Sequence, residues 1–388
     1  MNLRILAIHN RYLISGGEDK SHVAEINMLK SNGMLVDEYT EYNHRISELN
    51  YFSLALKTIW SQETYRKIRQ ILSRTKYDLV IIQNTFPLIS PSIYYAIKKH
   101  KIPCIQYLRN YRLMCLNALL FRNNMICEDC MRKFIPWPGI LHACYRNQFA
   151  ASKVVAAMLT IHRLLGTWQT KIDRYIALTE FARMKFIEGG IPKDLVAVKP
   201  NFVNPDPEPG EGEGNYFLFV GRLSNEKGVR TLIDAWDNLT PSIELRIIGN
   251  GDLKPEVVEK TLTNPSIKFL GEKSSNEVLT QIGNARCVII PSECYENLPR
   301  VMVESFSKGT PVIASNLKSI SGIVKDGITG LLFETGNASD LAAKVKWCWQ
   351  NPDKLSAMRH NARREFEEKY TIERNFRLFM EIYNGIKA

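Results

Sequence analysis

Two glutamates, Glu296 and Glu304, flank a segment that is typical of an anion-binding helix start. Pro299 suits the first position of a helix that we expect over Arg300 to Lys308, because the N–H that proline lacks would be unpaired there anyway. Glu296 lies in the loop before this helix, whereas Glu304 lies about 7 Å along it, at roughly 1.5 Å per residue. Carboxylates do not suit direct contact with phosphate. We therefore expect each to face hydroxyl groups beside a bound diphosphate, Glu296 those of a sugar and Glu304 those of a ribose.

The backbone between these two carboxylates is the expected phosphate contact. Around Asn297 and Leu298, just before the helix, N–H groups would be free to bind an anion. The spacing is equally compatible with an ordinary helix entry that carries two solvated glutamates. A second group of charged residues is needed to decide between these interpretations.

Two cations, Arg222 and Lys227, supply that second group. They follow the apolar run Asn215 to Val220, which predicts a strand that ends at Gly221, and they precede an amphipathic helix. Ligands of open α/β sheets bind at such strand-to-helix turns. The two cations could neutralise a diphosphate leaving group without a metal, and the sequence has no Asp-x-Asp pair that would suggest Mg²⁺. Alone they could be surface cations, but together with Glu296 and Glu304 they favour a nucleotide-sugar site.

Apolar strands that alternate with helical segments must position these residues. Such strands are expected at Leu3 to Ile8, Leu79 to Ile82, Cys104 to Tyr107, Tyr175 to Leu178 and from Tyr216 onward. With 388 residues and 45% hydrophobic content, the chain can form two domains, each with its own core. The alternation predicts an α/β fold of two Rossmann-like, doubly wound parallel-sheet domains that face a cleft.

The expected boundary lies at a segment rich in Pro, Gly and Glu, from Pro205 to Gly214, which is interpreted as the linker. Residues 1–202 would form an acceptor-binding domain and residues 203–370 a donor-binding domain. The last segment, residues 371–388, has helical periodicity.

Short motifs follow one another along nearly the whole chain in the order typical of one enzyme family. The second half contains Gly221-Arg-Leu-Ser-Asn-Glu-Lys-Gly228, Ile248-Gly-Asn-Gly-Asp252, Phe269-Leu-Gly271, the Glu296/Glu304 pair and Gly309-Thr-Pro-Val-Ile-Ala314. The first half contains His9-Asn-Arg-Tyr12, Gly16-Gly-Glu-Asp19, Asn84-Thr-Phe-Pro-Leu88 and Arg109-Asn-Tyr-Arg112. Each motif alone is weak, but the ordered set closely resembles family 4 of the retaining glycosyltransferases, which have the two-domain GT-B architecture. The four-cysteine insertion described below marks a branch that resembles bacterial polysaccharide-biosynthesis enzymes.

This resemblance implies a role for each matching residue. Arg222 and Lys227, beside Gly221, would hold the donor diphosphate, Glu304 the ribose, and Glu296 with the backbone of Asn297 and Leu298 the transferred sugar. Gly16 and Gly17 match a glycine turn that lets backbone approach the donor phosphates, where a Cβ would block the approach. Asn201 matches a position at the cleft, and the terminal helix would pack back on the first domain.

The chain departs from the family where many relatives place a histidine near the reacting carbon. The loop here is Tyr107-Leu-Arg-Asn-Tyr111, with Arg109 at that place. A guanidinium stays charged near neutral pH and cannot act as a base, so we expect an electrostatic role for Arg109. A donor phosphate oxygen could take the acceptor proton, as is suggested for similar enzymes, and the identity of a catalytic base stays open.

The resemblance therefore implies a metal-independent, retaining hexosyltransferase that needs no cofactor for transfer. Its donor would be a UDP-sugar first and GDP-mannose second, and its acceptor a hydroxyl of a glycan or lipid-linked glycan in bacterial surface polysaccharide synthesis. A nucleotide-sugar epimerase, a hydrolase or a sugar phosphorylase of the same architecture is the main alternative. A zinc-containing nucleic-acid-binding protein is disfavoured, because the cations are not interleaved with the aromatic residues of a known nucleic-acid module.

The excess of positive over negative charge is confined to the first half of the chain. Residues 1–202 hold 28 Lys and Arg against 15 Asp and Glu, whereas residues 203–388 hold 23 against 25. The segment Lys57 to Lys76 mixes cations with Trp60, Tyr65, Ile68 and Leu72 at helical spacing. That pattern suits an anionic membrane surface, or a surface helix whose apolar side faces the core. With no signal peptide and no long apolar run, we expect a cytoplasmic protein that at most rests on the inner face of the plasma membrane.

Four of the eight cysteines, Cys115, Cys127, Cys130 and Cys144, have the spacing C-x11-C-x2-C-x13-C. A Cys-x-x-Cys knuckle with two outlying thiols is typical of a tetrahedral structural zinc, with His142 as a spare ligand. Reduced core thiols, a disulfide and a redox pair are the alternatives. A cytosolic setting disfavours the disulfide, and two carboxylates inside the knuckle disfavour a reactive thiolate.

Overall fold

The computed structural model describes residues 3–13 and 16–387. The chain divides into two compact units, which are described here one at a time. The first comprises Met1–Leu120, Cys127–Lys199 and Phe376–Ala388, and the second comprises Phe121–Ile126 and Pro200–Asn375.

A six-stranded parallel sheet forms the centre of the first unit. Its strand order is β2-β1-β3-β4-β7-β8. The strands are β1 (Arg4–Arg11), β2 (Leu35–Tyr42), β3 (Leu79–Asn84), β4 (Cys104–Leu108), β7 (Arg174–Ala177) and β8 (Val196–Val198). Every residue of β3 and β4 is buried, as expected for parallel strands covered on both faces. The strands expected from the sequence are therefore confirmed, with ends shifted by a few residues.

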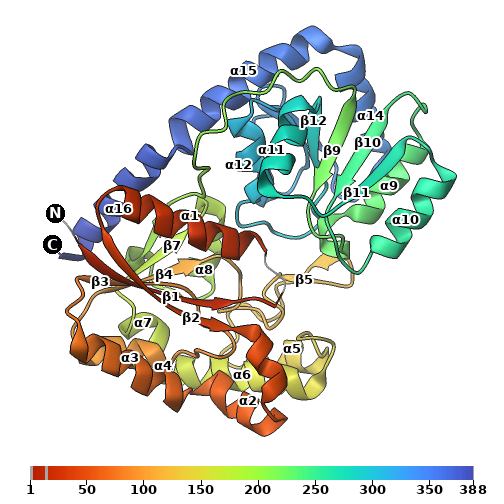
Figure 1. Ribbon diagram of the computed structural model, residues 1–388. Coiled ribbons are helices and arrows are strands. Elements are labelled where there is room, and N and C mark those ends of the chain that lie inside the picture. Colours follow the sequence, from red (N-terminus) through yellow and green to blue (C-terminus); the bar gives the residue numbers. More distant parts are fainter. Residues whose placement is uncertain (1–2, 14–15, 388) are drawn as a thin grey trace. The chain divides into compact units, whose positions relative to one another are not determined.

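Helices cover both faces of this sheet. They are α1 (Gly17–Ser31), α2 (Tyr51–Ile59), α3 (Gln62–Arg74), α4 (Ser92–Lys99), α5 (Trp137–Leu141), α6 (Phe149–Leu164), α7 (Thr167–Thr170) and α8 (Glu180–Glu188). In Figure 1, α1 lies on one side of the sheet, and α2, α3, α4 and α6 lie on the other. The short 3-10 helices η1 (Asn43–Glu48) and η2 (Lys193–Leu195) complete the connections.

The second unit contains another six-stranded parallel sheet, with the order β11-β10-β9-β12-β13-β14. Its strands are β9 (Tyr216–Val220), β10 (Glu244–Ile248), β11 (Ile267–Gly271), β12 (Cys287–Ile290), β13 (Val312–Ser315) and β14 (Gly330–Phe333). Two parallel-sheet α/β domains are the fold class that the sequence predicts, and the prediction is confirmed. A small antiparallel hairpin, β5 (Phe121–Arg122) and β6 (Met125–Ile126), is grouped with this unit.

Helices also flank the second sheet, with α9 and α10 on one side and α11 and α12 on the other (Figure 1). They are η3 (Asn225–Lys227), α9 (Val229–Asp237), α10 (Lys254–Thr263), α11 (Ser275–Asn284), α12 (Arg300–Ser307), α13 (Lys318–Ser321), α14 (Ala338–Gln350) and α15 (Pro352–Lys369). The fully buried Trp236 belongs to the core of this unit, and its indole N–H donates to Ile243 O at 2.9 Å. This satisfied polar tip lets a large aromatic side chain fill the core without an unpaired donor.

The segment interpreted as a linker is held against the second unit. Gly210 N donates to Lys308 O at 2.9 Å, and Gly214 N donates to Asn284 O at 2.8 Å. A Cβ on Gly210 would lie 2.3 Å from the Cα of Gly283, so this contact requires glycine. The glycines therefore permit close packing of the backbone along α11, which composition alone does not reveal.

The final helix, α16 (Ile372–Lys387), belongs to both units by sequence, because the grouping changes between Asn375 and Phe376. Near its end, Gly385 O accepts a hydrogen bond from Arg174 of β7 at 2.9 Å. Among the residues that the structure describes, no helix is long and apolar enough to cross a membrane.

Candidate functional site

In the second sheet the chain reverses its direction of winding between β9 and β12. These two strands are neighbours, although the chain forms β10 and β11 between them. Ligands of open parallel sheets bind outside the carboxyl ends of the strands at such a switch point. Gly221 to Lys227 follow β9, and Pro291 to Glu296 follow β12. The topology thus brings together two of the segments that the sequence singles out.

Two glycines let these loops approach their neighbours closely. Gly228, at φ +67°, carries the chain from η3 into α9, and a Cβ there would lie 1.8 Å from Pro291 O. Gly249, at φ +148°, packs against the start of the loop after β9, because a Cβ there would lie 1.8 Å from Gly221 O. Both distances are far inside contact, so any larger residue would displace the loop that carries Arg222 and Lys227.

Lys227 and Glu296 form an ion pair across the switch point, and Ser292 Oγ donates to the same Glu296 oxygen at 2.6 Å. Burial lowers the pKa of Lys227, but the negative charge of Glu296 outweighs it and the pKa is raised. Burial likewise raises the pKa of Glu296, and Lys227 with Ser292 outweighs that effect, so the pKa is lowered. Both groups therefore stay charged around neutral pH.

Arg222 is the more exposed of the two predicted cations, with 60% of its side chain accessible. Its Nη2 lies 3.0 Å from Glu226 Oε1, one turn further along the chain. The carboxylate restrains the guanidinium at the mouth of the switch point and leaves most of it facing solvent. An anion could therefore contact Arg222 without breaking buried interactions.

The loop that carries Glu296 is fixed by several contacts. Glu293 N donates to Glu226 O at 2.9 Å, and the Glu293 carboxylate accepts from Thr231 Oγ1 at 2.7 Å. Glu296 N donates to Ser319 Oγ at 3.2 Å. These bonds tie the loop after β12 to η3, α9 and α13, so Glu296 is held on a rigid base.

Helix α12 begins at Arg300, and Pro299 occupies the capping position just before it. The predicted start of the helix at Arg300 is confirmed, but Pro299 is not in its first position, because its ψ of 123° is extended. Glu304 is paired with Arg300 on the same helix, at 2.8 Å. A ribose contact from Glu304 would have to be made by the oxygen that Arg300 leaves available.

Two asparagines lie around the start of α12. Asn201 Nδ2 donates to Leu298 O at 3.3 Å, which fixes the backbone just before the helix. Asn297 is 8% exposed, and among the described residues its side-chain oxygen has no hydrogen-bond partner. This unsatisfied acceptor is of the kind that a bound hydroxyl group would satisfy.

The first sheet has its own switch point, between β1 and β3. At the end of β1, His9 Nε2 donates to Asp19 Oδ1 at 2.6 Å, and the ring of His9 stacks on that of His22 at 4.4 Å. Burial is the main cause that lowers the pKa of His22 to about 3, with the positive charge of His9 next. His22 is therefore neutral at physiological pH and buried, so it cannot serve as a solvent-facing base.

Arg109, the residue at the place of the family histidine, lies just after β4. Its Nε donates to Gln83 Oε1 at 2.6 Å, and its guanidinium lies 5.0 Å from the centre of the Tyr107 ring. Arg112, three residues further on in the same loop, has its guanidinium 4.5 Å from the centre of the Phe86 ring and 5.1 Å from that of the Tyr145 ring. Burial lowers the pKa of Arg112. Both side chains are thus held by aromatic rings and hydrogen bonds.

Gly16 and Gly17 begin α1, and both are exposed. A Cβ built on either would meet no atom within 4 Å. Packing within the first unit therefore does not explain why glycine occupies these positions. The neighbouring Ile14 and Ser15 lie outside the described residues.

A buried ion pair escaped the sequence analysis. Lys199 and Glu25 are each 1% exposed and their charged atoms lie 3.0 Å apart, while Tyr107 OH donates to Glu25 at 2.5 Å. Burial lowers the pKa of Lys199 against the opposing charge of Glu25. Glu25 lies 174 positions from Lys199, and no local pattern links them. His9 and Asp19 belong to two of the motifs in the first half of the sequence, but the hydrogen bond between them was not predicted.

None of the predicted site residues lines the well-formed cavity of about 400 Å³ in the first unit. Its walls come from the loop 132–134, the end of α6, Trp168 and the turn 188–191.

The four clustered cysteines lie close enough to affect one another. Burial, with smaller effects from Cys115, Cys144 and Cys127, raises the pKa of Cys130 to about 12. Cys115 Sγ donates a hydrogen bond to Asn117 Oδ1 at 2.9 Å. Across residues 3–13 and 16–387, no group of three or more His, Cys, Asp or Glu side chains is arranged to hold a metal ion. The structural zinc therefore stays a prediction, and the geometry does not add to it.

Comparison with known proteins finds a family model that matches most of the second unit. Residues 204–365 match the family model described as glycosyl transferases group 1. An uncharacterized glycosyltransferase of Methanocaldococcus jannaschii is 26% identical over 291 residues, which cover 71% of this chain and 81% of the relative. The phosphatidyl-myo-inositol mannosyltransferase of Mycobacterium leprae is 29% identical over 190 residues, 46% of this chain and half of the relative's length.

Among solved structures, Anabaena HepE in complex with UDP-glucose has a TM-score of 0.71 at 16% identity. The superposition covers 99% of this chain and all of HepE. At this identity the likeness establishes the fold, and the two-sheet architecture is that of the GT-B glycosyltransferases.

Proposed function

Because residues 204–365 belong to the group 1 glycosyl transferases, we propose that this chain transfers a sugar from a nucleoside-diphosphate donor to a hydroxyl group, with retention of anomeric configuration. The donor is a UDP-sugar first and GDP-mannose second. HepE, which has the same fold, was solved with UDP-glucose, and this supports the order of preference.

The observation that carries the proposal is the Lys227–Glu296 ion pair, with Arg222 beside it, at the β9/β12 switch point. Transfer releases a diphosphate, and the charge that develops on it must be stabilised. Arg222 and Lys227 supply two positive charges at the place where such ligands bind. The proposed donor site therefore needs no divalent metal.

The other residues take their roles from this placement. Glu296 accepts hydrogen bonds from sugar hydroxyls and holds the Lys227 ammonium in position. The backbone at Asn297 and Leu298 contacts the diphosphate, and Glu304 contacts the ribose. In the first unit, Gly16 and Gly17 leave room for phosphate, and Arg109 contributes positive charge.

Retention follows from reaction on one face of the sugar. The bond from the anomeric carbon to the donor phosphate oxygen breaks, and the acceptor oxygen forms its bond on the same side. The acceptor proton passes to the departing phosphate oxygen, so that no separate base is required. The acceptor is a hydroxyl of a glycan or lipid-linked glycan in the assembly of a bacterial surface polysaccharide. The matching phosphatidyl-myo-inositol mannosyltransferase supports a lipid-linked acceptor.

A panel of UDP-glucose, UDP-galactose, UDP-N-acetylglucosamine and GDP-mannose tests the donor. A donor at about 100 times its Kd should raise Tm by roughly 5 °C or more. Lys227→Ala should lose that shift. Analysis of the products separates the alternatives, because an epimerase converts the free donor to its epimer and a hydrolase releases sugar without an acceptor. A panel in which no nucleotide-sugar raises Tm or is consumed would refute the proposal.

A further inference from the structure

The first unit exposes an unusual number of large apolar side chains on three neighbouring elements. We call this surface the apolar face. It comprises Tyr51, Phe52 and Leu56 of α2, Phe134, Ile135, Trp137 and Leu141 in and before α5, and Phe149, Leu164 and Leu165 at the ends of α6. Phe52 is 71% exposed, Leu141 64% and Leu164 74%. Removal of this apolar surface from water by a binding partner would be favourable, so we expect the face to bind one.

The three elements are held together side by side. His162 of α6 donates through Nε2 to Ile59 O at the end of α2, at 3.0 Å. Arg163 of α6 donates to the carbonyl oxygens of Phe134, at 3.0 Å, and of Lys133. In Figure 1, α2, α5 and α6 lie together on the side of the first sheet opposite α1. The exposed side chains thus belong to one rigid layer.

Charge on this layer has a single sign. From Cys130 to Ile172 the chain has six Lys or Arg residues and no Asp or Glu. Several of these cations lie against the exposed rings: Lys133 Nζ is 5.5 Å from the centre of the Trp137 ring, and Lys153 Nζ is 4.4 Å from that of Phe149. Aromatic and aliphatic groups intermixed with cations are typical of surfaces that bind at a lipid–water interface.

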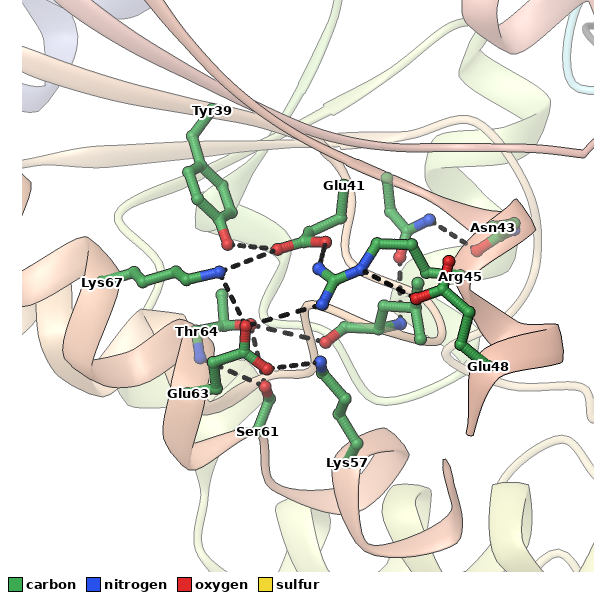
Figure 2. Close-up of polar contacts among 12 residues, drawn as sticks. Tyr39, Glu41, Asn43, Arg45, Glu48, Lys57, Ser61, Glu63, Thr64 and Lys67 are labelled. Atoms are coloured by element: carbon green, nitrogen blue, oxygen red, sulfur yellow. Dashed lines mark hydrogen bonds and ion pairs between the residues drawn. The ribbon is translucent and has the colours of Figure 1, made fainter. Parts of the chain in front are cut away.

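The other basic segment of this unit, residues 57–76, is compensated only in part, because its one carboxylate, Glu63, pairs with two of its cations. Figure 2 shows Lys57 and Lys67 on either side of Glu63, at 2.7 and 2.6 Å, and Arg45 paired with Glu41. The apolar residues of α3 turn inward, since Ile68 is fully buried and Leu72 is 5% exposed. The apolar pattern at residues 57–76 is therefore explained by packing, whereas the exposed rings of Trp137 and Phe149 have cations beside them.

We propose that the apolar face docks on an anionic lipid bilayer. Its side chains would enter the boundary between headgroups and acyl chains, to a depth of about 5–10 Å. The cations beside them would pair with lipid phosphates. A protein partner would need hydrogen-bonding groups to match, whereas this surface offers bare aliphatic and aromatic groups ringed by positive charge. The inference does not depend on the proposed function, because bilayer binding requires neither donor nor acceptor.

Co-sedimentation of the full chain with vesicles tests the docking. Vesicles of phosphatidylcholine with about 30% phosphatidylglycerol should carry down the protein, and pure phosphatidylcholine should carry down far less. Phe52→Ser combined with Leu141→Ser and Leu164→Ser should weaken binding roughly tenfold or more. A matched control, Leu35→Ser with Val258→Ser and Leu262→Ser, removes exposed apolar groups elsewhere and should bind like the wild type.

The cations are tested separately. Arg132→Gln with Lys133→Gln and Lys153→Gln should weaken binding by about fivefold per charge removed, and added salt should weaken the wild type in the same direction. Thermal melts followed by circular dichroism check that the variants are folded. Because the substituted positions are exposed, the variants should have the same Tm as the wild type.

Three results would overturn the inference. The first is a wild-type chain that ignores anionic vesicles, and the second is a Phe52/Leu141/Leu164 variant that binds them fully. The third is a wild-type dimer in the absence of vesicles that this variant dissociates, since the face would then belong to a second copy of the chain.

Discussion

At the scale of single residues, the Lys227–Glu296 ion pair is the main charged contact that the structure shows in the candidate site. The pair joins two residues that are 69 positions apart, and it gives Glu296 a structural role besides its proposed contact with the sugar. Removal of either partner leaves the other charge buried and uncompensated, which is costly. A loss of activity must therefore be distinguished from a loss of stability.

We expect Lys227→Ala and Arg222→Ala each to lower transfer by roughly 10- to 100-fold. Each removes a proposed charge-assisted contact to the diphosphate, worth about 1.5–3 kcal/mol. Initial rates with saturating acceptor measure the effect. Arg230→Ala is a matched control, because Arg230 pairs with Glu256 on exposed helices of the same unit.

The double variant Lys227→Ala/Glu296→Gln separates stability from catalysis. It removes the uncompensated charge, so it should melt at a higher temperature than Lys227→Ala while it stays inactive. Near-normal turnover in both Lys227→Ala and Arg222→Ala would show that the diphosphate does not bind here.

At the scale of secondary-structure elements, a charged network fixes α3 against β2 and η1. Figure 2 shows Glu63 of α3 among Lys57, Lys67 and Arg45, and Tyr39 OH donates to Glu41 at 2.5 Å. Hydrogen bonds from Lys57 and Lys67 lower the pKa of Glu63 to about 2. Because the folded pKa lies below the unfolded one, ionised Glu63 stabilises the fold at neutral pH.

Glu63→Gln should lower the free energy of unfolding at pH 7 by about 1 kcal/mol, a value reduced for the 42% exposure of the side chain. The difference from the wild type should be full above the unfolded pKa of about 4.3 and shrink as pH falls toward 2. Urea unfolding at pH 7 and pH 3.5 measures it. Glu48→Gln, at the 63% exposed edge of the network, is the control. A difference that grows in acid would contradict the assigned direction of the pKa shift.

The segment from Cys115 to Cys144 carries the second prediction at this scale. If the four thiols bind a structural zinc, protein purified without added metal should contain about one zinc per chain. Cys127→Ser should then lower both zinc content and Tm, whereas Cys104→Ser should keep the zinc. Zinc-free protein with full activity, and with the Tm of Cys127→Ser, would leave these residues as ordinary thiols.

At the scale of the whole molecule, charge is divided between the two halves of the chain. Residues 1–202 carry the whole excess of cations, and residues 203–388 are nearly balanced. The half that is proposed to bind the donor therefore cannot rely on a general positive field. Its affinity for a diphosphate must come from particular residues such as Arg222 and Lys227.

Transfer should accordingly survive brief treatment with EDTA. If Arg222 and Lys227 replace a divalent metal at the diphosphate, initial rates should stay largely unchanged, and any closed structural zinc would be released slowly. Rates measured before and after chelation, with and without Mg²⁺ or Mn²⁺, give the answer. Prompt loss that either ion restores would point to a metal-dependent donor site.

The sequence alone determined the fold class and the segments that carry chemistry. Buried parallel strands appear as continuous apolar runs, and the residues after them belong to the carboxyl ends of the sheet. The positions of Arg222, Lys227 and Glu296 at those ends followed from local pattern. The helix after Pro299 was also local, with the correct start at Arg300 and an error of one residue at its end.

Only the tertiary structure decided which partners these residues have and which apolar groups face solvent. The Lys227–Glu296 and Lys199–Glu25 pairs join residues far apart in sequence, and their energies depend on burial that no local window records. The apolar residues of α3 and of α2 look alike as sequence. Those of α3 are buried in the first unit, whereas Phe52 of α2 is 71% exposed. Hydrophobicity indicates that a side chain favours burial, but the packing of elements from distant parts of the chain decides whether it is buried.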